Sequence, residues 1–385
     1  MTTEEIPVLA QFGLTGEQAE IRALARKIAQ DRFKPRSLEW EETGKFPWEN
    51  MEILAKAGLL GASVPEEYGG AGGTWLDAAL ILEQLGSACY VTAMAALGEL
   101  GVQIRAIAAY GTEEQKRRFL PDVAAGKRIC AVSMTEADAG SDIWAMRTKA
   151  VVDGDDVVVN GGKVLCSRAD VAGLFIVYVR WSDDPGTRPI GAVLIERGTP
   201  GFTISPGRKT LGGEDLYDLT FENCRIPSSN VLVREDGFRR MLTAFNGQRC
   251  LNASISVGIA QGAQDAAVEY VKTRSQGGGL LGDHQGIRWM LADNEVEIQA
   301  ARQLVWRAAA NAAQAFPSRH EAAVAKVNAN EMALRVTDRV LQIFGGNGWV
   351  KEMPAERYLR WARYGPLGGG TPQIQRNAIA RELLK

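Results

Sequence analysis

The sequence predicts a multidomain α+β chain in which a helical domain is followed by a β-domain and then by a helical bundle. Apolar residues recur every three to four positions in the first third of the chain, which is typical of helices that bury one face. Short β-branched runs separated by Asp/Gly turns follow them, and long helical segments occupy the last third. We therefore expect domains over residues 1–126, 127–235 and 236–385.

The expected helices of the first domain begin at recognisable caps. Two capping boxes, Thr15–Gln18 and Thr112–Gln115, each mark the start of a helix. The first of these helices should continue until Pro35 interrupts it. Another helix is expected near residues 48–57, and the Ala- and Leu-rich stretch 75–109 predicts two packed helices.

Strands are expected from Lys127 to Val233, where runs such as LFIVYVR and IGAVLIE are rich in β-branched residues. The stretch VDGDD is a hairpin signal, because its Asp and Gly residues favour a tight turn. Helical periodicity then returns in segments long enough for a bundle. These segments are 238–274, 284–315, 320–344, 354–363 and 371–384.

Composition excludes several classes of function. The formal net charge is −2 and the pI is near 6.0, which gives no electrostatic basis for binding nucleic acid or an anionic membrane. The N-terminus lacks the pattern of a signal peptide, and no apolar run approaches the ~20 residues that a membrane span needs. Five scattered cysteines without a CxxC pair suggest free buried thiols in a reducing compartment, the cytoplasm.

The scarcity of histidine limits the possible mechanisms. The chain has two histidines, His284 and His320, and neither lies near a nucleophile motif. This excludes a His-rich metal site, so we expect no metal. A large enzyme with so little histidine is expected to take its reactivity from a cofactor.

The segment CAVSMTEADAGSD, residues 130–142, leaves a predicted strand and enters a loop of small residues. By composition alone it fits an ordinary strand-to-loop turn. It also resembles the flavin-binding signature of the acyl-CoA dehydrogenase superfamily, and four further stretches match that family in order and at similar spacing. They are FNGQR (245–249), HQGIRWMLAD (284–293), LQIFGGNGW (341–349) and GGGTPQIQRNAIAR (368–381).

The resemblance implies a fold, a cofactor and partners. The fold would be an N-terminal all-α domain, a middle β-barrel or β-sandwich and a C-terminal four-helix bundle. The cofactor would be FAD, and the ligand an acyl-CoA or carrier-protein thioester. A homotetramer is implied, because residues Gln342–Gly346 contact a neighbour's flavin in this family. An electron-transfer flavoprotein would accept electrons from a dehydrogenase.

The resemblance also implies roles for individual residues. The flavin ring would lie against Met134, Thr135, Gly140, Ser141, Leu165, Cys166 and Ser167. The phosphates and adenosine of FAD would meet Arg274, Gln276, His284 and Gln285 and, from a neighbouring subunit, Gln342, Ile343, Gly345 and Gly346. Thr371 and Gln373 would close the site. Acyl-CoA would contact Ser141, Asn246, Gln248, Arg249 and Arg381.

Residue chemistry agrees with several of these roles but allows simpler interpretations. Arg274 offers a forked donor for a pyrophosphate, although it could equally be a solvated surface arginine. The GGNG run at 345–348 permits close backbone approach to a ligand, although it could be a simple helix stop. Arg249 opens an apolar helix and needs a partner, which could be the acyl-CoA or an acidic side chain.

The sequence departs from the family where the catalytic base should be. Removing the α-proton of a thioester needs a carboxylate. The two positions at which the family carries this base are Gln248 and Gly369 here. Two further departures affect the flavin side: Leu165 replaces an aromatic residue, and Gln276 is followed by three glycines instead of Phe-Gly. Gly368 and Gly369 predict a roomy pocket for a bulky or branched acyl group.

Three explanations of the missing base stay open. The base could have moved to Glu99, with Glu214 and Asp215 as weaker candidates, although a structural pair of Glu99 with Arg105 or another cation is favoured over catalysis. The reaction could be a different one, since the superfamily includes desulfinases of 3-sulfinopropionyl-CoA and flavin monooxygenases. A desulfinase needs an arginine for the sulfinate, for which Arg105 is the candidate. Finally, the protein could bind FAD or acyl-CoA without turnover. We favour an FAD-dependent oxidoreductase that performs α,β-dehydrogenation.

Overall fold

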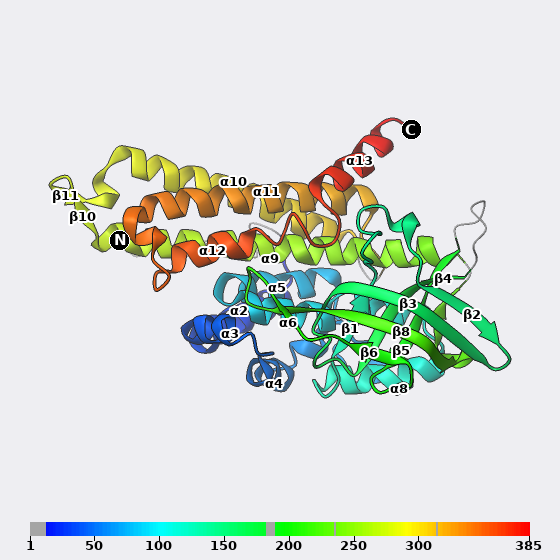
Figure 1. The fold of residues 1–385 in the computed structure, drawn as a ribbon. Helices are drawn as coiled ribbons and strands as arrows, with labels where there is room; N and C mark the ends of the chain where they lie inside the picture. The colour runs from blue at the N-terminus through cyan, green and yellow to red at the C-terminus, as the bar shows by residue number, and fades with distance from the viewer. Residues whose placement is uncertain (1–12, 182–188, 235, 313–314) are drawn as a thin grey trace.

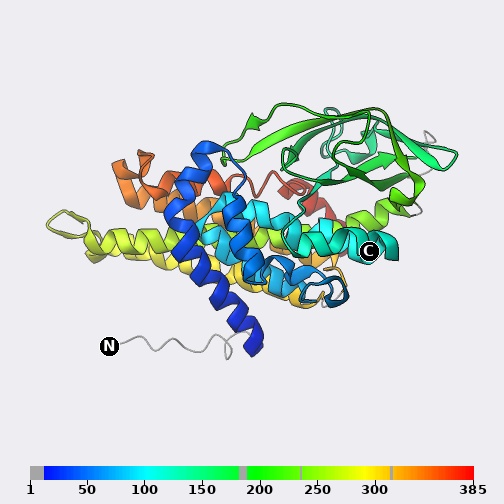
Figure 2. The same ribbon diagram turned by 90° about the horizontal axis from the view of Figure 1, so that it is seen from below.

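The computed structural model describes residues 13–181, 189–234, 236–312 and 315–385. Figure 1 shows three long helices, α9, α10 and α11, lying side by side across the molecule, with the shorter N-terminal helices packed against them. The β-sheet lies at one end of this helical body. In Figure 2 it forms a separate layer beside the helices, along one side of the molecule. The predicted order of helices, sheet and helices is confirmed.

The N-terminal helices follow the predicted pattern with one exception. Both capping boxes are present, at Thr15 and at Thr112. The stretch 75–109 forms three helices and not two, because Cys89 takes an extended conformation and Gly101 interrupts the chain again. The helices are α2 (Gly16–Ile28), α3 (Ser37–Thr43), α4 (Trp48–Lys56), α5 (Trp75–Ala88), α6 (Tyr90–Leu100), α7 (Val102–Tyr110) and α8 (Glu113–Ala124).

The expectation that no apolar run approaches the length of a membrane span is wrong for helices α6 and α7, which together form the one described segment long and apolar enough to cross a membrane. In this segment, Tyr90–Tyr110, 94% of the most apolar 18-residue window is buried inside the protein. It contacts α5, α9 and strand β1, so it belongs to the core. Its apolar composition is therefore explained by packing.

The described strands of the middle domain hydrogen-bond into one mostly antiparallel sheet. The order along its main path is β6-β8-β3-β2-β4-β5-β9, with β1 added beside β4 and β7 beside β8. The predicted hairpin turn is confirmed at Gly154, between β2 and β3. The strands are β1 (Cys130–Ser133), β2 (Lys149–Asp153), β3 (Asp156–Ser167), β4 (Leu174–Arg180), β5 (Ile190–Glu196), β6 (Phe202–Ile204), β7 (Arg208–Lys209), β8 (Asp215–Pro227) and β9 (Val231–Val233).

The C-terminal domain is built around one helix of 37 residues, α9 (Gly237–Thr273). Its first turn touches strand β5 at Gly191, and its far end leads into the small hairpin of β10 and β11. Figure 1 shows this hairpin at the end of the molecule opposite the sheet. The remaining elements are β10 (Ser275–Gln276), β11 (Gly279–Leu280), α10 (Gln285–Ala310), α11 (Arg319–Phe344), α12 (Pro354–Ala362) and α13 (Pro372–Leu383).

All five cysteines are buried, and none forms a disulfide. This confirms the predicted free thiols. Burial raises the pKa of each thiol that lies in the core, for example that of Cys166 to about 11. These cysteines therefore act as small apolar core residues.

Candidate active site

The loop that follows β1 is fixed from beneath by a buried ion pair. Lys163 on β3 donates from Nζ to Glu136 Oε1 at 2.6 Å and to the carbonyl of Met134 at 3.2 Å. Glu136 also accepts from the backbone amides of Arg147 and Thr148. The pair leaves Met134 and Thr135 partly exposed and Gly140 and Ser141 fully exposed. Their surface is available to a ligand.

Strand β3 ends in a turn that presents a single apolar side chain to solvent. The register between β3 and β8 shifts between Lys163 and Cys166, and Leu165 there has a φ of 60°. Its side chain is 52% exposed, while that of Ser167 is half-buried. Cys166 points the other way, and its thiol contacts Ser133 Oγ at 2.9 Å. The expected flavin contact of the Cys166 side chain is therefore wrong, and only its backbone can face a ligand.

The first half of α9 meets the loop between α12 and α13. Arg249 Nη1 donates to Asn246 Oδ1 at 2.6 Å, and Arg249 Nε lies 3.4 Å from the carbonyl oxygen of Gly369. Gln248 Oε1 lies 3.4 Å from the backbone nitrogen of Val102. The structure thus brings Arg249 to Gly369, one of the two expected base positions, while Gln248, the other, contacts the start of α7.

Arg249 is half-buried here and has no carboxylate partner among the described residues. Burial, together with the charge of Arg319, lowers the pKa of Arg249 to about 10. The predicted alternative of an acidic partner on a neighbouring helix is wrong for the described part of the chain. A guanidinium whose charge is not balanced by a carboxylate favours an anionic or carbonyl group on the ligand.

Glu99 is not free to act as a base. It is completely buried, and its Oε2 accepts from Arg168 Nη1 at 2.8 Å. Its Oε1 accepts from the backbone nitrogen of Cys130 at 3.1 Å. Burial raises the pKa of Glu99, and the ion pair with Arg168 opposes that effect. The geometry supports the structural pair that the sequence favoured, with Arg168 as the partner.

Arg105 takes no part in that pair. Its Nη2 donates to the carbonyl of Gly73 at 2.6 Å, and its guanidinium lies over the ring of Trp75. Burial lowers the pKa of Arg105 to about 10. These contacts hold the side chain against the loop before α5. Both suggested roles of Arg105, as the partner of Glu99 and as a ligand for a sulfinate, therefore lack support.

The weaker base candidates lie in front of β8. Glu214 accepts from the hydroxyl of Tyr90 at 2.8 Å and from Thr210 Oγ1 at 3.1 Å. Burial raises the pKa of Glu214. Asp215 is half-buried beside it. Both acids line a cavity between α6 and the ends of β3 and β8, but no contact joins them to Gln248 or Gly369.

The residues expected to hold the phosphates and adenosine of FAD gather at the other end of α9. Arg274 follows the last residue of α9, and His284 Nε2 lies 3.0 Å from the carbonyl of Gln276. The Gly345–Trp349 turn lies beside them, because Asn347 Nδ2 donates to Tyr270 Oη at 2.9 Å. The exposed residues of this group are Arg274, Gln276, His284, Gln285, Gln342, Gly345 and Gly346.

Ile343 differs from its neighbours in this group. Its side chain is buried in the helical core with 4% exposure, so the expected cofactor contact of that side chain is wrong. Helical spacing explains this, since Ile343 and Val340 lie on the inward face of α11.

The two groups of residues lie far apart within one chain. Gln248 and Arg274 are separated along the continuous helix α9 by roughly 39 Å, at ~1.5 Å per residue. Figure 1 shows the sheet and the β10–β11 hairpin at opposite ends of the molecule. Arg274 and its neighbours lie instead beside the Gly345–Trp349 turn, so their role toward FAD stays a prediction.

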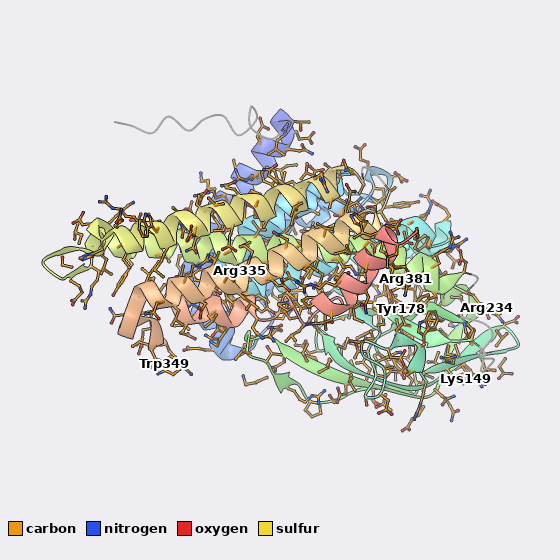
Figure 3. The ribbon with its side chains drawn as sticks, turned by 90° about the horizontal axis from the view of Figure 1, so that it is seen from above. Lys149, Tyr178, Arg234, Arg335, Trp349 and Arg381 are labelled. Carbon is orange, nitrogen blue, oxygen red and sulfur yellow. The ribbon has the colours of Figure 1, made fainter. Side chains whose placement is uncertain are left out.

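The C-terminal segment carries the last predicted residues. Thr371 caps α13 through Oγ1, which accepts from the amide of Ile374 at 3.4 Å, and Gln373 is exposed in the first turn. Arg381 lies on the exposed side of α13 near the end of the chain (Figure 3). Within the described residues of one chain Arg381 reaches no partner and remains only a predicted substrate contact.

Comparison with known proteins places the whole chain in one family. Models of the acyl-CoA dehydrogenase N-terminal, middle and C-terminal domains match residues 15–127, 131–224 and 235–384. The chain belongs to the acyl-CoA dehydrogenase family. It is an acyl-CoA dehydrogenase-like flavoenzyme that acts on acyl-CoA.

Its similarity to individual family members extends over nearly the full length. The short-chain specific acyl-CoA dehydrogenase of Clostridium acetobutylicum is 36% identical over 97% of this chain and 100% of the relative. The 3-sulfinopropanoyl-CoA desulfinase of Variovorax paradoxus is 34% identical over 97% of this chain and 96% of the relative. The structure of butyryl-CoA dehydrogenase from Megasphaera elsdenii superposes with a TM-score of 0.93 at 32% identity, covering 97% of this chain and 100% of that one.

The residues of this family member fit FAD, the cofactor typical of the family. On the flavin side, Leu165 offers an exposed apolar surface beside the exposed backbone of Gly140. On the adenosine side, Arg274 is an exposed cation without an ion pair in the described chain, and a Cβ added to Gly345 or Gly346 would meet open space. Both surfaces therefore have donors and room for the cofactor.

Two residues of the site were missed from the sequence. Arg168 follows the flavin-side triplet directly, and its place next to Ser167 was the available signal. Lys326 on α11 is 1% exposed and donates from Nζ to the carbonyl of Gly365 at 2.8 Å, which anchors the loop that carries Gly369. Asn330 donates to the same carbonyl at 2.7 Å. A lone lysine in the apolar run AAVAK was the signal for this anchor.

Proposed function

We propose that this chain is an FAD-dependent oxidoreductase that performs α,β-dehydrogenation of an acyl-CoA thioester without a protein carboxylate at the α-proton. Bound FAD would accept the hydride from the β-carbon of the substrate, and the α-proton would pass to solvent water. The observation that carries the proposal is the contact of Arg249 on α9 with the carbonyl of Gly369 in the α12–α13 loop, with Gln248 preceding Arg249 on the same helix.

The residues at this place are suited to binding and orientation. Arg249 is half-buried without a carboxylate partner in the described chain and can donate a hydrogen bond to an oxygen of the thioester. Lys326 and Asn330 fix the α12–α13 loop through the carbonyl of Gly365, so the backbone at Gly369 has a defined position. We infer that these residues orient the thioester. Correct orientation of the substrate supplies a large part of the rate enhancement in such a site.

Gln248 would lie where the α-proton leaves. Its amide oxygen can accept a hydrogen bond but has no useful basicity. The carboxylates considered in its place are engaged elsewhere, Glu99 by Arg168 and Glu214 by Tyr90. A positioned base contributes about 10²–10⁴ to the rate, so the native protein should reduce its flavin slowly.

The test restores a carboxylate with an isosteric change, Gln248→Glu. The purified FAD-loaded protein is titrated anaerobically with butanoyl-CoA, and bleaching of the oxidised-flavin absorption is followed. The Glu variant should bleach about 10²–10⁴ times faster than the native protein. Gln248→Met, of similar volume and without basicity, is the matched control and should not accelerate the reaction. Equal rates in all three proteins would show that residue 248 is not at the α-proton.

A second candidate function is a desulfinase-type lyase acting on a sulfinated acyl-CoA. The observation that favours it is the absence of a carboxylate at both base positions, together with the 34% identity to a 3-sulfinopropanoyl-CoA desulfinase. Release of sulfite from 3-sulfinopropanoyl-CoA, with the flavin remaining oxidised, would support this candidate. Bleaching by butanoyl-CoA without sulfite release would support dehydrogenation.

We also propose a homo-oligomer, a tetramer, in the cytoplasm. The residues proposed for the flavin and those proposed for the adenosine lie far apart within one chain. A second copy would bring Arg274 and its neighbours to the flavin side, which supports an oligomer. Exposed apolar side chains in the C-terminal domain support it further. Trp289 is 61% exposed, and Trp349, which Figure 3 labels, is 84% exposed. For a dehydrogenase, an electron-transfer flavoprotein is the proposed electron acceptor.

A further inference from the structure

A buried arginine occupies the space between the end of β3 and helix α6. Arg168 follows the last residue of β3 and has a φ of 62°, in the left-handed region. Its side chain is 10% exposed. Nη1 donates to the carbonyl of Ala95 at 3.1 Å and to Glu99 Oε2 at 2.8 Å. The guanidinium therefore lies directly on α6.

Helix α6 makes room for this guanidinium with a glycine. A Cβ added at Gly98 would lie 1.8 Å from Arg168 Nη1, so no other residue type fits there while Arg168 keeps its position. With the Gln103 amide turned so that its oxygen faces Arg168, Gln103 accepts from Nη2 at 2.6 Å. Glu99, Gln103 and the carbonyl of Ala95 hold the guanidinium in one orientation.

The arginine lies close to the proposed reaction site. A Cβ added at Gly101 would lie 2.7 Å from Gln248 Oε1, and Gly101 is three residues after Gly98. Gly101 follows the last residue of α6, and its backbone nitrogen lies 3.4 Å from the carbonyl oxygen of Gly98. Arg168 and Gln248 therefore contact positions at the C-terminal end of α6 that are joined by one turn.

A cavity opens beside the guanidinium. Its lining includes Val91, Met94 and Ala95 of α6, Ser167 and Arg168 at the end of β3, and Glu214 in front of β8. Arg168 Nε is buried and has no hydrogen-bond partner among the described residues. A buried donor without an acceptor is unfavourable, so an acceptor supplied by a ligand would stabilise the complex.

We propose that Arg168 is a specificity-determining residue that ends the acyl pocket and selects short acyl groups with a neutral hydrogen-bond acceptor at their far end. The inference rests on the proposed function, because it takes the side of α6 next to Gln248 as the acyl site. The blocking guanidinium leaves no path along α6 for a long chain, and Nε offers one hydrogen bond to a hydroxyl or carbonyl oxygen. The acyl pocket proposed here is short, whereas Gly368 and Gly369 predict a roomy one from the sequence.

The charges around the cavity favour a neutral acceptor over an anion. Glu99 already balances the charge of Arg168 at 2.8 Å. The other charged residues that line the cavity are Lys45, Asp170, Glu214 and Asp215, so acidic groups outnumber basic ones. A carboxylate or sulfinate at the end of the acyl group would be repelled by these acids.

The test measures binding of a panel of thioesters to the FAD-loaded protein. Dissociation constants are determined by calorimetry for butanoyl-CoA, 4-hydroxybutanoyl-CoA, succinyl-CoA and octanoyl-CoA, with free CoA as the reference. We expect 4-hydroxybutanoyl-CoA to bind roughly five-fold tighter than butanoyl-CoA, the effect of one added hydrogen bond. Octanoyl-CoA and succinyl-CoA should each bind at least about ten-fold more weakly than 4-hydroxybutanoyl-CoA.

A double variant removes the arginine without leaving a buried charge. Glu99→Gln combined with Arg168→Gly keeps the φ of 62° free of strain and opens the pocket. It should bind octanoyl-CoA at least as tightly as butanoyl-CoA and lose the preference for the hydroxyl. Gly16→Ala, at the exposed start of α2 with no atom within 4 Å, is the control and should keep the native ranking.

The outcomes separate this inference from the proposed function. Equal binding of octanoyl-CoA and butanoyl-CoA by the native protein would overturn the inference, as would a preference for succinyl-CoA. This holds even if the double variant does not fold, because the native panel decides it. Failure of free CoA and of every thioester to bind would instead contradict the proposed acyl-CoA function.

Discussion

At the scale of single residues, the flavin-side loop depends on one buried ion pair. Burial raises the pKa of Glu136, but the charge of Lys163 outweighs that effect and holds the pKa below its usual value. Burial lowers the pKa of Lys163 to about 8. The pair lies beneath Met134, so its loss should affect the stability of the protein and the shape of the flavin surface together.

The first prediction concerns Lys163→Met. The change leaves the Glu136 carboxylate buried with only its two backbone donors, which should lower the free energy of unfolding by about 3 kcal/mol. Urea unfolding at pH 7 measures the loss. The double variant Glu136→Gln with Lys163→Met removes the buried charge and should recover part of it. A loss below about 1 kcal/mol in the single variant would show that the pair is not important for stability.

The second prediction concerns the pH dependence that Lys326 causes. Burial and the charge of Arg249 lower the pKa of Lys326 to about 7, against 10.5 for a free lysine. Between these values the unfolded chain binds one more proton than the folded one, so folded stability rises with pH by about 1.4 kcal/mol per unit. Relative to Lys326→Met, the native protein should gain roughly 2–3 kcal/mol from pH 7 to pH 9.

Urea unfolding at pH 6, 7.5 and 9 checks the pH dependence. The exposed residue Lys272 provides the control, because Lys272→Met should give a curve parallel to that of the native protein. A parallel curve for Lys326→Met as well would contradict the lowered pKa.

The residue scale also shows where sequence reasoning fails. The sequence predicts that Glu99 is buried and needs a cation, and both features are present. It could not choose the partner, because Arg168 is 69 residues away and reaches α6 only through the turn at the end of β3. The same applies to Cys166, whose direction depends on a register shift with β8. Partners set by tertiary packing have no local signal.

At the scale of elements, helices α5 and α9 are in contact through their backbones. A Cβ added at Gly258 of α9 would lie 2.0 Å from the carbonyl oxygen of Glu83, and one added at Gly86 of α5 would lie 2.7 Å from that of Ile255. Glycines on both helices therefore permit the close approach. The buried pair of Arg302 with Glu83 lies beside this contact and ties α10 to the same place.

The third prediction is that Gly258→Ala destabilises the protein strongly. The added methyl group meets backbone, which cannot move aside, so the free energy of unfolding should fall by about 3 kcal/mol. Gly16→Ala at the exposed start of α2, where no atom lies within 4 Å, should change it by less than about 1 kcal/mol. Thermal unfolding compares the two. Similar melting temperatures for the two variants would mean that α5 and α9 can move apart without loss of stability.

Element boundaries were predicted from the sequence where they carry a local signal. The capping boxes at Thr15 and Thr112 and the turn at Gly154 are examples, because their side chains or backbone angles define the end of an element. The break at Cys89 has no such signal. It divides an apolar run without proline or glycine at the break, and its cause is the packing of α5 and α6 in the core.

At the scale of the whole molecule, the two parts of the proposed FAD site lie at opposite ends of α9. The flavin side includes Leu165 and the adenosine side includes Arg274. A sequence motif gives the residues of each part but not the length of helix between them. The uninterrupted course of α9 keeps the two parts far apart within one chain, which is the basis for proposing that they come from different copies.

The last prediction tests this arrangement by mixing two defective chains. Arg274→Ala removes the cation of the adenosine side, and Leu165→Glu places a carboxylate on the flavin side, so each variant alone should lose FAD. The two chains are coexpressed with different tags, and the mixed oligomer is purified on both. In each mixed pair, one site combines two intact parts and the other combines two defective parts. Mixed pairs should therefore carry FAD in half of their sites, measured by flavin absorption relative to protein absorption.

A mixed oligomer without FAD would show that both parts of the site belong to the same chain. Helix α9 would then have to bend or break when the cofactor binds.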